Sequence, residues 1–110
     1  MRNPILTSNI FEFESFGDEN GNNPYGTGTV QTTNTVIDGY TEVIVLSNTY
    51  DENLPEEQKF KNKQFYVVSN ATPDNETLYQ LYVNTNGNLE PIGVWVKIKE
   101  VTNELTPLTD

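Results

Sequence analysis

Two glycine-containing dipeptides, Asp38-Gly39 and Asn86-Gly87, set the first constraint on this fold, because each stands between two runs rich in β-branched and aromatic residues. Those runs cover residues 29–37, 40–47, 77–84 and 89–100. Such dipeptides favour the two-residue type I′ turn that joins antiparallel strands. The sequence therefore predicts two β-hairpins.

The turns also predict a register for each hairpin, because a two-residue loop fixes which residues face one another. In the first hairpin the expected pairs are Ile37 with Tyr40, Val36 with Thr41, and Thr33 with Ile44. In the second they are Tyr82 with Pro91, Leu81 with Ile92, Tyr79 with Val94, Leu78 with Trp95, and Thr77 with Val96. Pro91 has no N–H, so we expect full pairing only beyond it.

The last strand has the clearest pattern. Ile92, Val94, Val96 and Ile98 alternate with Gly93, Trp95, Lys97 and Lys99. This period of two is typical of a half-buried strand, and we expect the aliphatic set to face inward. A further strand is expected within residues 60–69. The fold class that follows is all-β: a small antiparallel β-sandwich or a partly open barrel, with an extended N-terminal arm.

The first 28 residues are expected to form that arm. Phe11 and Phe13 point to one side of a short extended segment that also contains Ile10 and Phe16, and residues 17–28 are a dense cluster of turn formers. We expect these four side chains to be an adhesive, protein-binding surface. The predicted organisation is an arm over residues 1–28, a β-domain over 29–100 and a polar tail over 101–110.

The residue types weigh against catalysis. The chain contains no histidine and no cysteine, which are the usual general base and the strongest soft nucleophile. The candidate carboxylate pairs, Glu12/Glu14 and Asp51/Glu52, lie on a short strand and in an acidic loop, not in apolar settings that would raise a pKa. We therefore expect no enzyme activity, no catalytic residue and no cofactor.

The charge narrows the choice of partners. A formal net charge of −10 opposes binding to nucleic acid and to anionic membranes. No segment resembles a secretory signal or a membrane-spanning helix, so we expect the chain to be made and used, or assembled, in the cytoplasm. Two oxygen-rich turns, Asp18–Asn22 and Asp74–Glu76, lack the spacing of a calcium-binding loop. We expect ordinary turns there and assign no metal ligand, with calcium left open.

Aromatic side chains supply the best binding hypothesis. In one arrangement Tyr82 and Trp95 share the outer face of the sheet, where they would stack on a sugar or contact a protein. In the other, which we favour, residues 29–48 cover that face and make Trp95 part of the core.

Three runs carry a resemblance to a known group of proteins. Residues 63–70 (KQFYVVSN), 78–84 (LYQLYVN) and 87–94 (GNLEPIGV) resemble the small β-hairpin modules of structural proteins in tailed bacteriophages, among them head-fibre, capsid-decoration and tail-attachment proteins. The Asn/Thr/Glu-rich, histidine-free composition is similar to virion proteins of crAss-like phages.

The resemblance implies a non-enzymatic virion component that works in multiple copies or as a homo-oligomer and docks on capsid or tail proteins. Two alternatives stay open: a module that binds host glycans, and an acidic inhibitor of a host protein that acts on nucleic acids.

Overall fold

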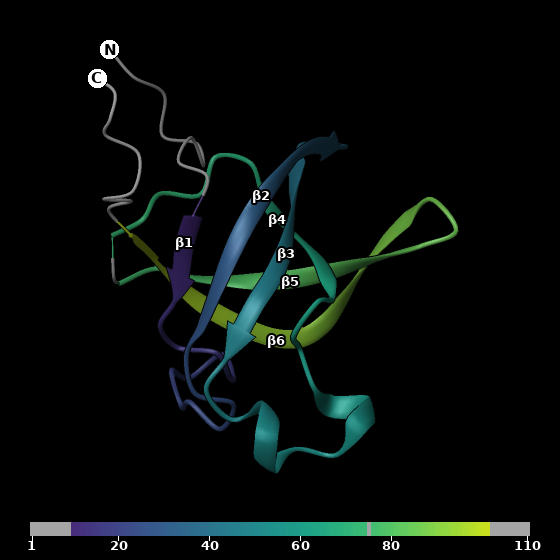
Figure 1. Ribbon diagram of the computed structural model, residues 1–110. Coiled ribbons are helices and arrows are strands. Elements are labelled where there is room, and N and C mark those ends of the chain that lie inside the picture. Colours follow the sequence, from purple (N-terminus) through teal and green to yellow (C-terminus); the bar gives the residue numbers. More distant parts are fainter. Residues whose placement is uncertain (1–9, 75, 102–110) are drawn as a thin grey trace, which may run out of the picture.

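The computed structural model describes residues 10–74 and 76–101, and these residues form one closed antiparallel β-barrel (Figure 1). Each strand pairs with its neighbours in the sequence, and the first strand closes the barrel against the last. The strands are β1 (Ile10–Phe13), β2 (Gly28–Ile37), β3 (Tyr40–Asn48), β4 (Gln64–Val68), β5 (Leu78–Thr85) and β6 (Asn88–Glu100). The predicted antiparallel all-β class is confirmed, and the barrel is closed.

Strand β1 closes the barrel, so the prediction of a free arm is wrong for the described residues from Ile10 onward. Phe11 pairs with Val30 of β2 on one side and with Glu100 of β6 on the other. The side chains of Phe11, Phe13 and Phe16 are at most 1% exposed, and Ile10 is half-buried. The backbone of β1 pairs with the edge strands β2 and β6 of its own barrel, and the rings of Phe11, Phe13 and Phe16 are buried inside it. These three side chains therefore offer no adhesive surface. Residues 1–9 and 102–110 lie outside the described part.

Both predicted hairpins form, and the register departs from the ideal at two points in the first and at one point in the second. In the first, Val36 faces Thr41 as predicted, but Gln31 and not Thr33 faces Ile44, because an irregularity lies between Thr32 and Val36. Asn34 within it has a φ of 71°. The turn residues Asp38 and Gly39 fix the register only next to the turn, so they do not predict the additional residues of β2 between Thr32 and Val36.

In the second hairpin, Tyr82 faces Pro91 as predicted, and pairing already begins at Asn88, before the proline. Beyond Tyr82 the register shifts, so that Trp95 faces Gln80 and not Leu78, and Val96 faces Tyr79. Gly93 lies at this shift with a φ of 76°, a conformation that glycine adopts without strain. Tyr79 and Leu78 therefore have partners other than the predicted ones, Val96 pairs with Tyr79 and not with Thr77, and Leu81 falls within the shift.

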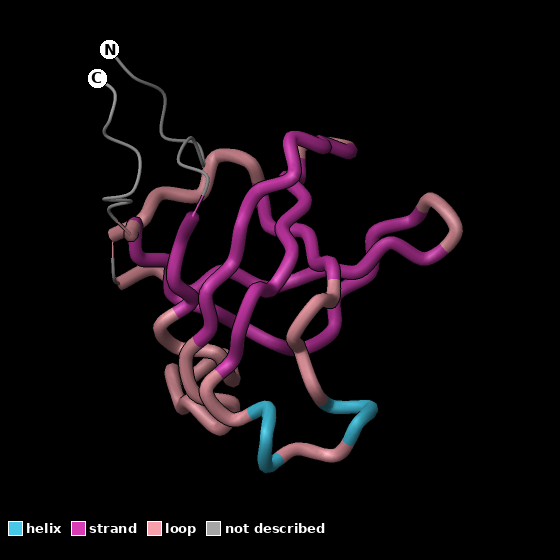
Figure 2. Tube along the Cα trace, viewed as in Figure 1, coloured by secondary structure: helices cyan, strands magenta, loops and turns pink. Residues whose placement is uncertain are grey.

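The barrel interior is filled by side chains. Val94, Val96 and Ile98 of β6 are buried as predicted, Ile92 is partly buried, and the core continues through Val30, Val43, Val45, Phe65, Val67 and Leu81. Aromatic rings close one end of the barrel. The ring centroid of Phe60 lies 4.5 Å from that of Phe16 and 5.1 Å from that of Tyr25. These rings bring the 14–27 and 49–63 loops to the same end of the barrel (Figure 2).

The 49–63 loop carries two 3-10 turns, η1 (Asp51–Asn53) and η2 (Glu56–Gln58). Asp51 is buried, and its carboxylate accepts the backbone N–H of Phe60 at 3.0 Å and of Lys61 at 2.9 Å. This side chain therefore holds the two ends of the loop together and positions Phe60 against the core.

Candidate interaction surface

The distal part of the β5–β6 hairpin projects beyond the barrel wall (Figure 1). Residues 84–88 are all exposed, whereas Val83 and Ile92 still pack against the core. The turn is closed by Asn84, whose Oδ1 accepts the Gly87 N–H at 2.8 Å. The hairpin is therefore anchored at its base and open to contact at its tip.

Tyr82 and Trp95 lie on the outer face, at the base of this hairpin. Leu81, Val94 and Val96 point into the core, so their alternating neighbours Tyr82 and Trp95 point outward, and both are half-buried. Both aromatic residues therefore lie on the outer face, and the expectation that residues 29–48 cover that face and make Trp95 a core residue is wrong. The Trp95 backbone also exchanges two hydrogen bonds with Gly17, of 2.7 and 2.9 Å.

A second tyrosine extends this surface across the barrel. The rings of Tyr40 and Tyr82 lie 4.8 Å apart with a 58° angle between their planes. A hydrogen bond with Tyr82 and partial burial raise the pKa of Tyr40 above its usual value. Tyr40 follows the Asp38-Gly39 turn, so this contact ties the first hairpin to the second.

A hydrogen-bonded carboxylate supports the tyrosines. Glu42 accepts a hydrogen bond from the Tyr66 hydroxyl at 2.8 Å through Oε2 and one from Thr33 through Oε1. Tyr66 faces Tyr82 across the β4–β5 seam and is only 4% exposed. Burial, followed by the hydrogen bond to Glu42, raises the pKa of Tyr66. We call Tyr40, Glu42, Tyr66 and Tyr82 the tyrosine cluster.

The outer face of the hairpin continues the cluster toward the tip. Because cross-strand partners share a face, Leu89 and Asn84 lie on the same side as the pair of Tyr82 and Pro91. Glu90 and Val83 form the pair between them and point the other way. The outer face therefore runs from a tyrosine through a proline to a leucine, without a charged side chain.

Pro91 also blunts the free edge of β6. The two-residue turn makes Thr85 and Asn88 the first hydrogen-bonded pair, so alternation makes Tyr82 and Pro91 a pair without mutual hydrogen bonds. The proline nitrogen then points away from β5. Among the described residues, the backbone contacts of that edge lie between Trp95 and Glu100, beyond the proline. A proline on an open edge prevents unwanted strand addition, so contact through side chains is favoured here.

High pH should loosen the tyrosine cluster. Tyr40 and Tyr66 have folded-state pKa values above the usual value of about 10. The resulting stability is fully present below pH 10 and is lost as the pH rises through the raised pKa values. We expect the free energy of unfolding in urea to fall above pH 10, and the Tyr66→Phe variant to show a smaller fall.

The matched control for that prediction is Glu42→Gln, which should move the ionisation of Tyr66, followed by absorbance at 295 nm, to lower pH. A Tyr66→Phe variant with the same alkaline loss of stability as the wild type would contradict the assignment.

The two oxygen-rich turns are held by their own carboxylates. Asp18 accepts hydrogen bonds from the Asn22 side chain and from the Asn20 and Asn22 backbone, each at 3.0 Å. Asp74 accepts the N–H groups of Glu76 and Thr77 and the Thr77 hydroxyl. These hydrogen bonds lower the pKa of both carboxyl groups. The largest contribution comes from the Asn22 side chain for Asp18 and from the Thr77 backbone N–H for Asp74. Internal hydrogen bonds therefore account for the aspartates in both turns.

The interaction surface was only half visible in the sequence. Tyr82 lies on the hairpin whose turn is evident, but Tyr40, Glu42 and Tyr66 are brought next to it by the β3–β4 and β4–β5 pairings. A 15-residue loop and a nine-residue loop separate those strands in the sequence, so the pairings could not be predicted. For Tyr40, the Asp38-Gly39 turn was the one sequence feature that indicated a position at the start of a strand.

Comparison with known proteins found no matching family model, no matching curated protein and no matching solved structure. No helix within the described residues is both long and apolar enough to cross a bilayer.

Proposed function

We propose that this protein is a non-enzymatic structural component of a tailed-phage particle, an auxiliary or decoration protein of the capsid or a fibre-attachment protein. It is made in the host cytoplasm and works in the virion in multiple copies. The observation that carries the proposal is the projecting β5–β6 hairpin, which presents an uncharged outer face on a rigid base.

The filled barrel supports the same conclusion. The interior is occupied by aliphatic and aromatic side chains such as Phe13, Leu81 and Val96, which are 0% exposed. Ligand-carrying barrels hold their ligand inside, whereas a small barrel packed with side chains offers only its outer surface. A rigid barrel with a protruding hairpin fits a scaffold that contacts neighbouring proteins.

The docking surface in this proposal is the outer face of the hairpin, not the first strand. Tyrosine, proline and leucine side chains at the edge of a rigid element lose little conformational entropy on binding. The tyrosine cluster holds the base of the hairpin, so the tip is presented in one direction.

A host-glycan module is the second candidate, because Tyr82 and Trp95 are half-buried on the outer face. The 58° tilt between Tyr40 and Tyr82 disfavours it, since a sugar stacks best on a flat platform. The third candidate, an acidic inhibitor, has no comparable feature in its favour.

Co-sedimentation with particles assembled from the capsid and tail proteins of the same genome tests the proposal. We expect the wild-type chain to co-sediment and Leu89→Ser to reduce the bound fraction about tenfold, the usual cost of losing an interface anchor. The matched control is Glu90→Ser, the next residue on the opposite face, which should stay within about twofold. Absence of the chain from purified particles by mass spectrometry would rule the proposal out.

A further inference from the structure

Glu42 of β3 is the single charged residue in the four consecutive strands β2, β3, β4 and β5. Its side chain points to the outer face of the barrel, because its neighbours Thr41 and Val43 are buried on the inner face. Glu42, Tyr40 and Tyr82 are all half-buried, so each keeps part of its surface open to solvent. The wall of the barrel therefore presents one carboxylate beside tyrosine rings, in otherwise uncharged surroundings.

The hydrogen bonds of Glu42 leave its charge in place. The hydroxyls of Thr33 and Tyr66 each donate to one of its two oxygens, and both donors are neutral. A carboxylate has about four acceptor positions, so each oxygen can take a further hydrogen bond. No lysine in residues 10–74 and 76–101 forms an ion pair with this carboxylate. The free acceptor positions therefore match a cation with two donors.

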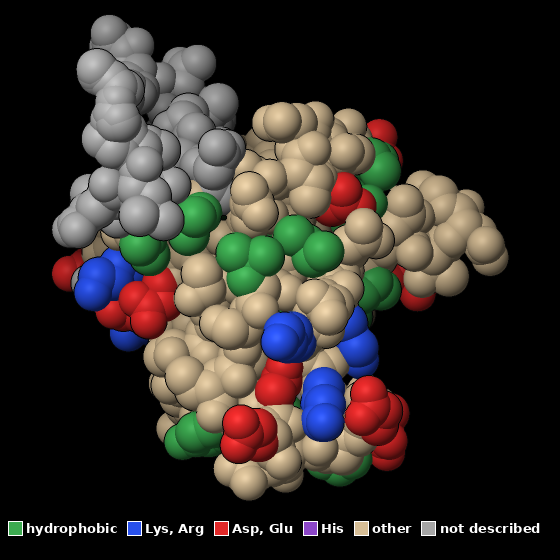
Figure 3. Space-filling model, viewed as in Figure 1, with side chains coloured by type: hydrophobic (Ala, Val, Ile, Leu, Met, Phe, Trp, Pro, Cys, Tyr) green, Lys and Arg blue, Asp and Glu red, His purple; other side chains and the backbone are tan. Residues whose placement is uncertain are grey.

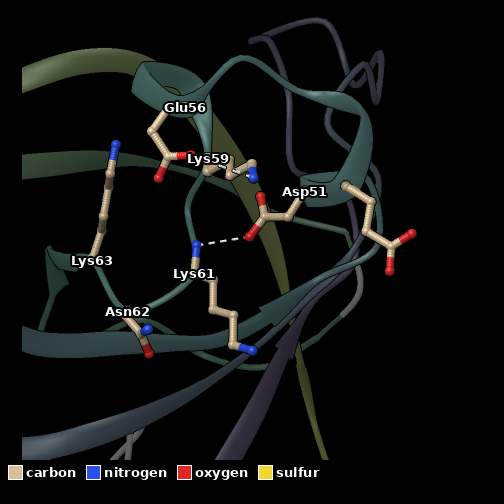
Figure 4. Close-up of a pocket in the computed structure, with 7 residues that line it drawn as sticks. Asp51, Glu56, Lys59, Lys61, Asn62 and Lys63 are labelled. Carbon is tan, nitrogen blue, oxygen red and sulfur yellow. Dashed lines mark hydrogen bonds and ion pairs between the residues drawn. The ribbon is translucent and has the colours of Figure 1, made fainter.

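The lysines of the described chain belong to the 49–63 loop and to β6. Figure 3 shows basic and acidic side chains together at the end of the barrel that carries η1 and η2, and no basic side chain on the projecting hairpin in this view. On β6, the Lys99 ammonium lies 3.6 Å from the Glu14 carboxylate. The loop lysines share their hollow with three carboxylates (Figure 4): Lys59, Lys61 and Lys63 with Asp51, Glu52 and Glu56. A cation for Glu42 has to come from outside the described chain.

The rings beside Glu42 favour arginine among the possible cations. Tyr40 lies two positions before Glu42 on the same face of β3, about 7 Å along the strand, and its ring packs against that of Tyr82 at 4.8 Å. The face of a tyrosine ring attracts a cation. A guanidinium stacks on such a face and donates two parallel hydrogen bonds to one carboxylate, whereas a lysine ammonium binds as a point charge.

We propose that Glu42 and the rings of Tyr40 and Tyr82 bind an arginine side chain from a basic segment of a partner protein; this rests on the proposed function and specifies the chemistry of the partner at the base of the docking hairpin. A net charge of −10 attracts a basic segment over a distance, and β2–β5 contain no lysine or arginine to repel it. A second copy is disfavoured, because two chains with this charge repel each other as they approach.

An NMR titration of the full chain with the peptide acetyl-Gly-Arg-Gly-amide tests this site without any phage particle. We expect saturable amide shifts centred on residues 40–42, 66 and 82, which weaken as salt is raised. Glu42→Gln should bind about tenfold more weakly, the usual effect of losing a charge-assisted hydrogen bond at a half-buried position. Tyr40→Leu keeps the carboxylate and should bind about threefold more weakly, through loss of the cation–π contact.

Three controls isolate the site. Glu12→Gln removes the same charge from another half-buried strand position and should bind within about twofold of the wild type. Leu89→Ser, which tests docking on the particle, should leave peptide binding unchanged, so failure of the docking function and failure of the arginine site are distinguished. Arg2→Gln should also bind like the wild type. Circular dichroism should show every variant folded.

Arginine binding at this site is ruled out if no saturable shift appears at the tyrosine cluster, or if Glu42→Gln and Glu12→Gln weaken binding equally. It is also ruled out if the peptide with citrulline or lysine in place of arginine binds as tightly. Two further results would identify a different occupant. Tighter binding by Arg2→Gln would point to the chain's own Arg2, and self-association that disappears in Glu42→Gln would point to a second copy. Either result would contradict the choice of a partner protein.

Discussion

Replacing Phe13 with alanine should destabilise the barrel by about 3–5 kcal/mol, the range for a large aromatic side chain removed from a close-packed core. Phe13 is 0% exposed and its ring stands edge-on to Phe16 at 5.7 Å. Domains of this size have a free energy of unfolding of about 5–15 kcal/mol, so this substitution removes a large fraction of it. Urea unfolding followed by the fluorescence of Trp95, the single tryptophan, measures the change.

The control for Phe13 is Val36→Ala at the tip of the first hairpin, where the side chain is 60% exposed. This variant should change stability by no more than about 0.5 kcal/mol. The comparison also separates two views of the first strand. If residues 10–16 were an arm that waits for a partner, Phe13→Ala would leave the isolated chain as stable as Val36→Ala does.

Replacing Asp51 with alanine should cost about 3 kcal/mol, because the N–H groups of Phe60 and Lys61 lose a charged acceptor in a buried position. The neighbouring Phe60 ring would lose its fixed position against Phe16. Thermal unfolding by circular dichroism and urea titration both report the loss.

Glu52→Ala is the matched control for Asp51, since Glu52 occupies the next position of η1 and is exposed. It should have little effect on stability. Equal effects of the two substitutions would mean that the buried carboxylate does not hold the loop.

The local pattern of the chain predicted much of the sheet. Both type I′ turns, the inward set Val94, Val96 and Ile98 and the near absence of helix follow from side-chain alternation and turn chemistry, which act over a few residues. Register was predicted only near the turns. Beyond them, the irregularity at Asn34 and the shift at Gly93 moved the pairs, and both positions have a positive φ that the surrounding sheet imposes.

The interaction surface was predicted less completely, because it is assembled from four strands. Tyr82 and Trp95 lie on the hairpin whose turn was visible. Glu42 and Tyr66 meet because β3 pairs with β4 across the 49–63 loop, and neither residue carries a signal of that pairing in its own neighbourhood.

The sequence by itself determined the antiparallel strands, the two hairpins and the absence of histidine and cysteine chemistry. Only the tertiary structure decided where Phe11, Phe13 and Phe16 go. An apolar strand gains nearly the same free energy by covering its own core or that of a neighbour, so alternation alone cannot distinguish the two. Here β2 and β6 each have an edge with unpaired backbone N–H and C=O groups next to the first strand. β1 lies between them and forms hydrogen bonds with both, so the sheet closes within one chain.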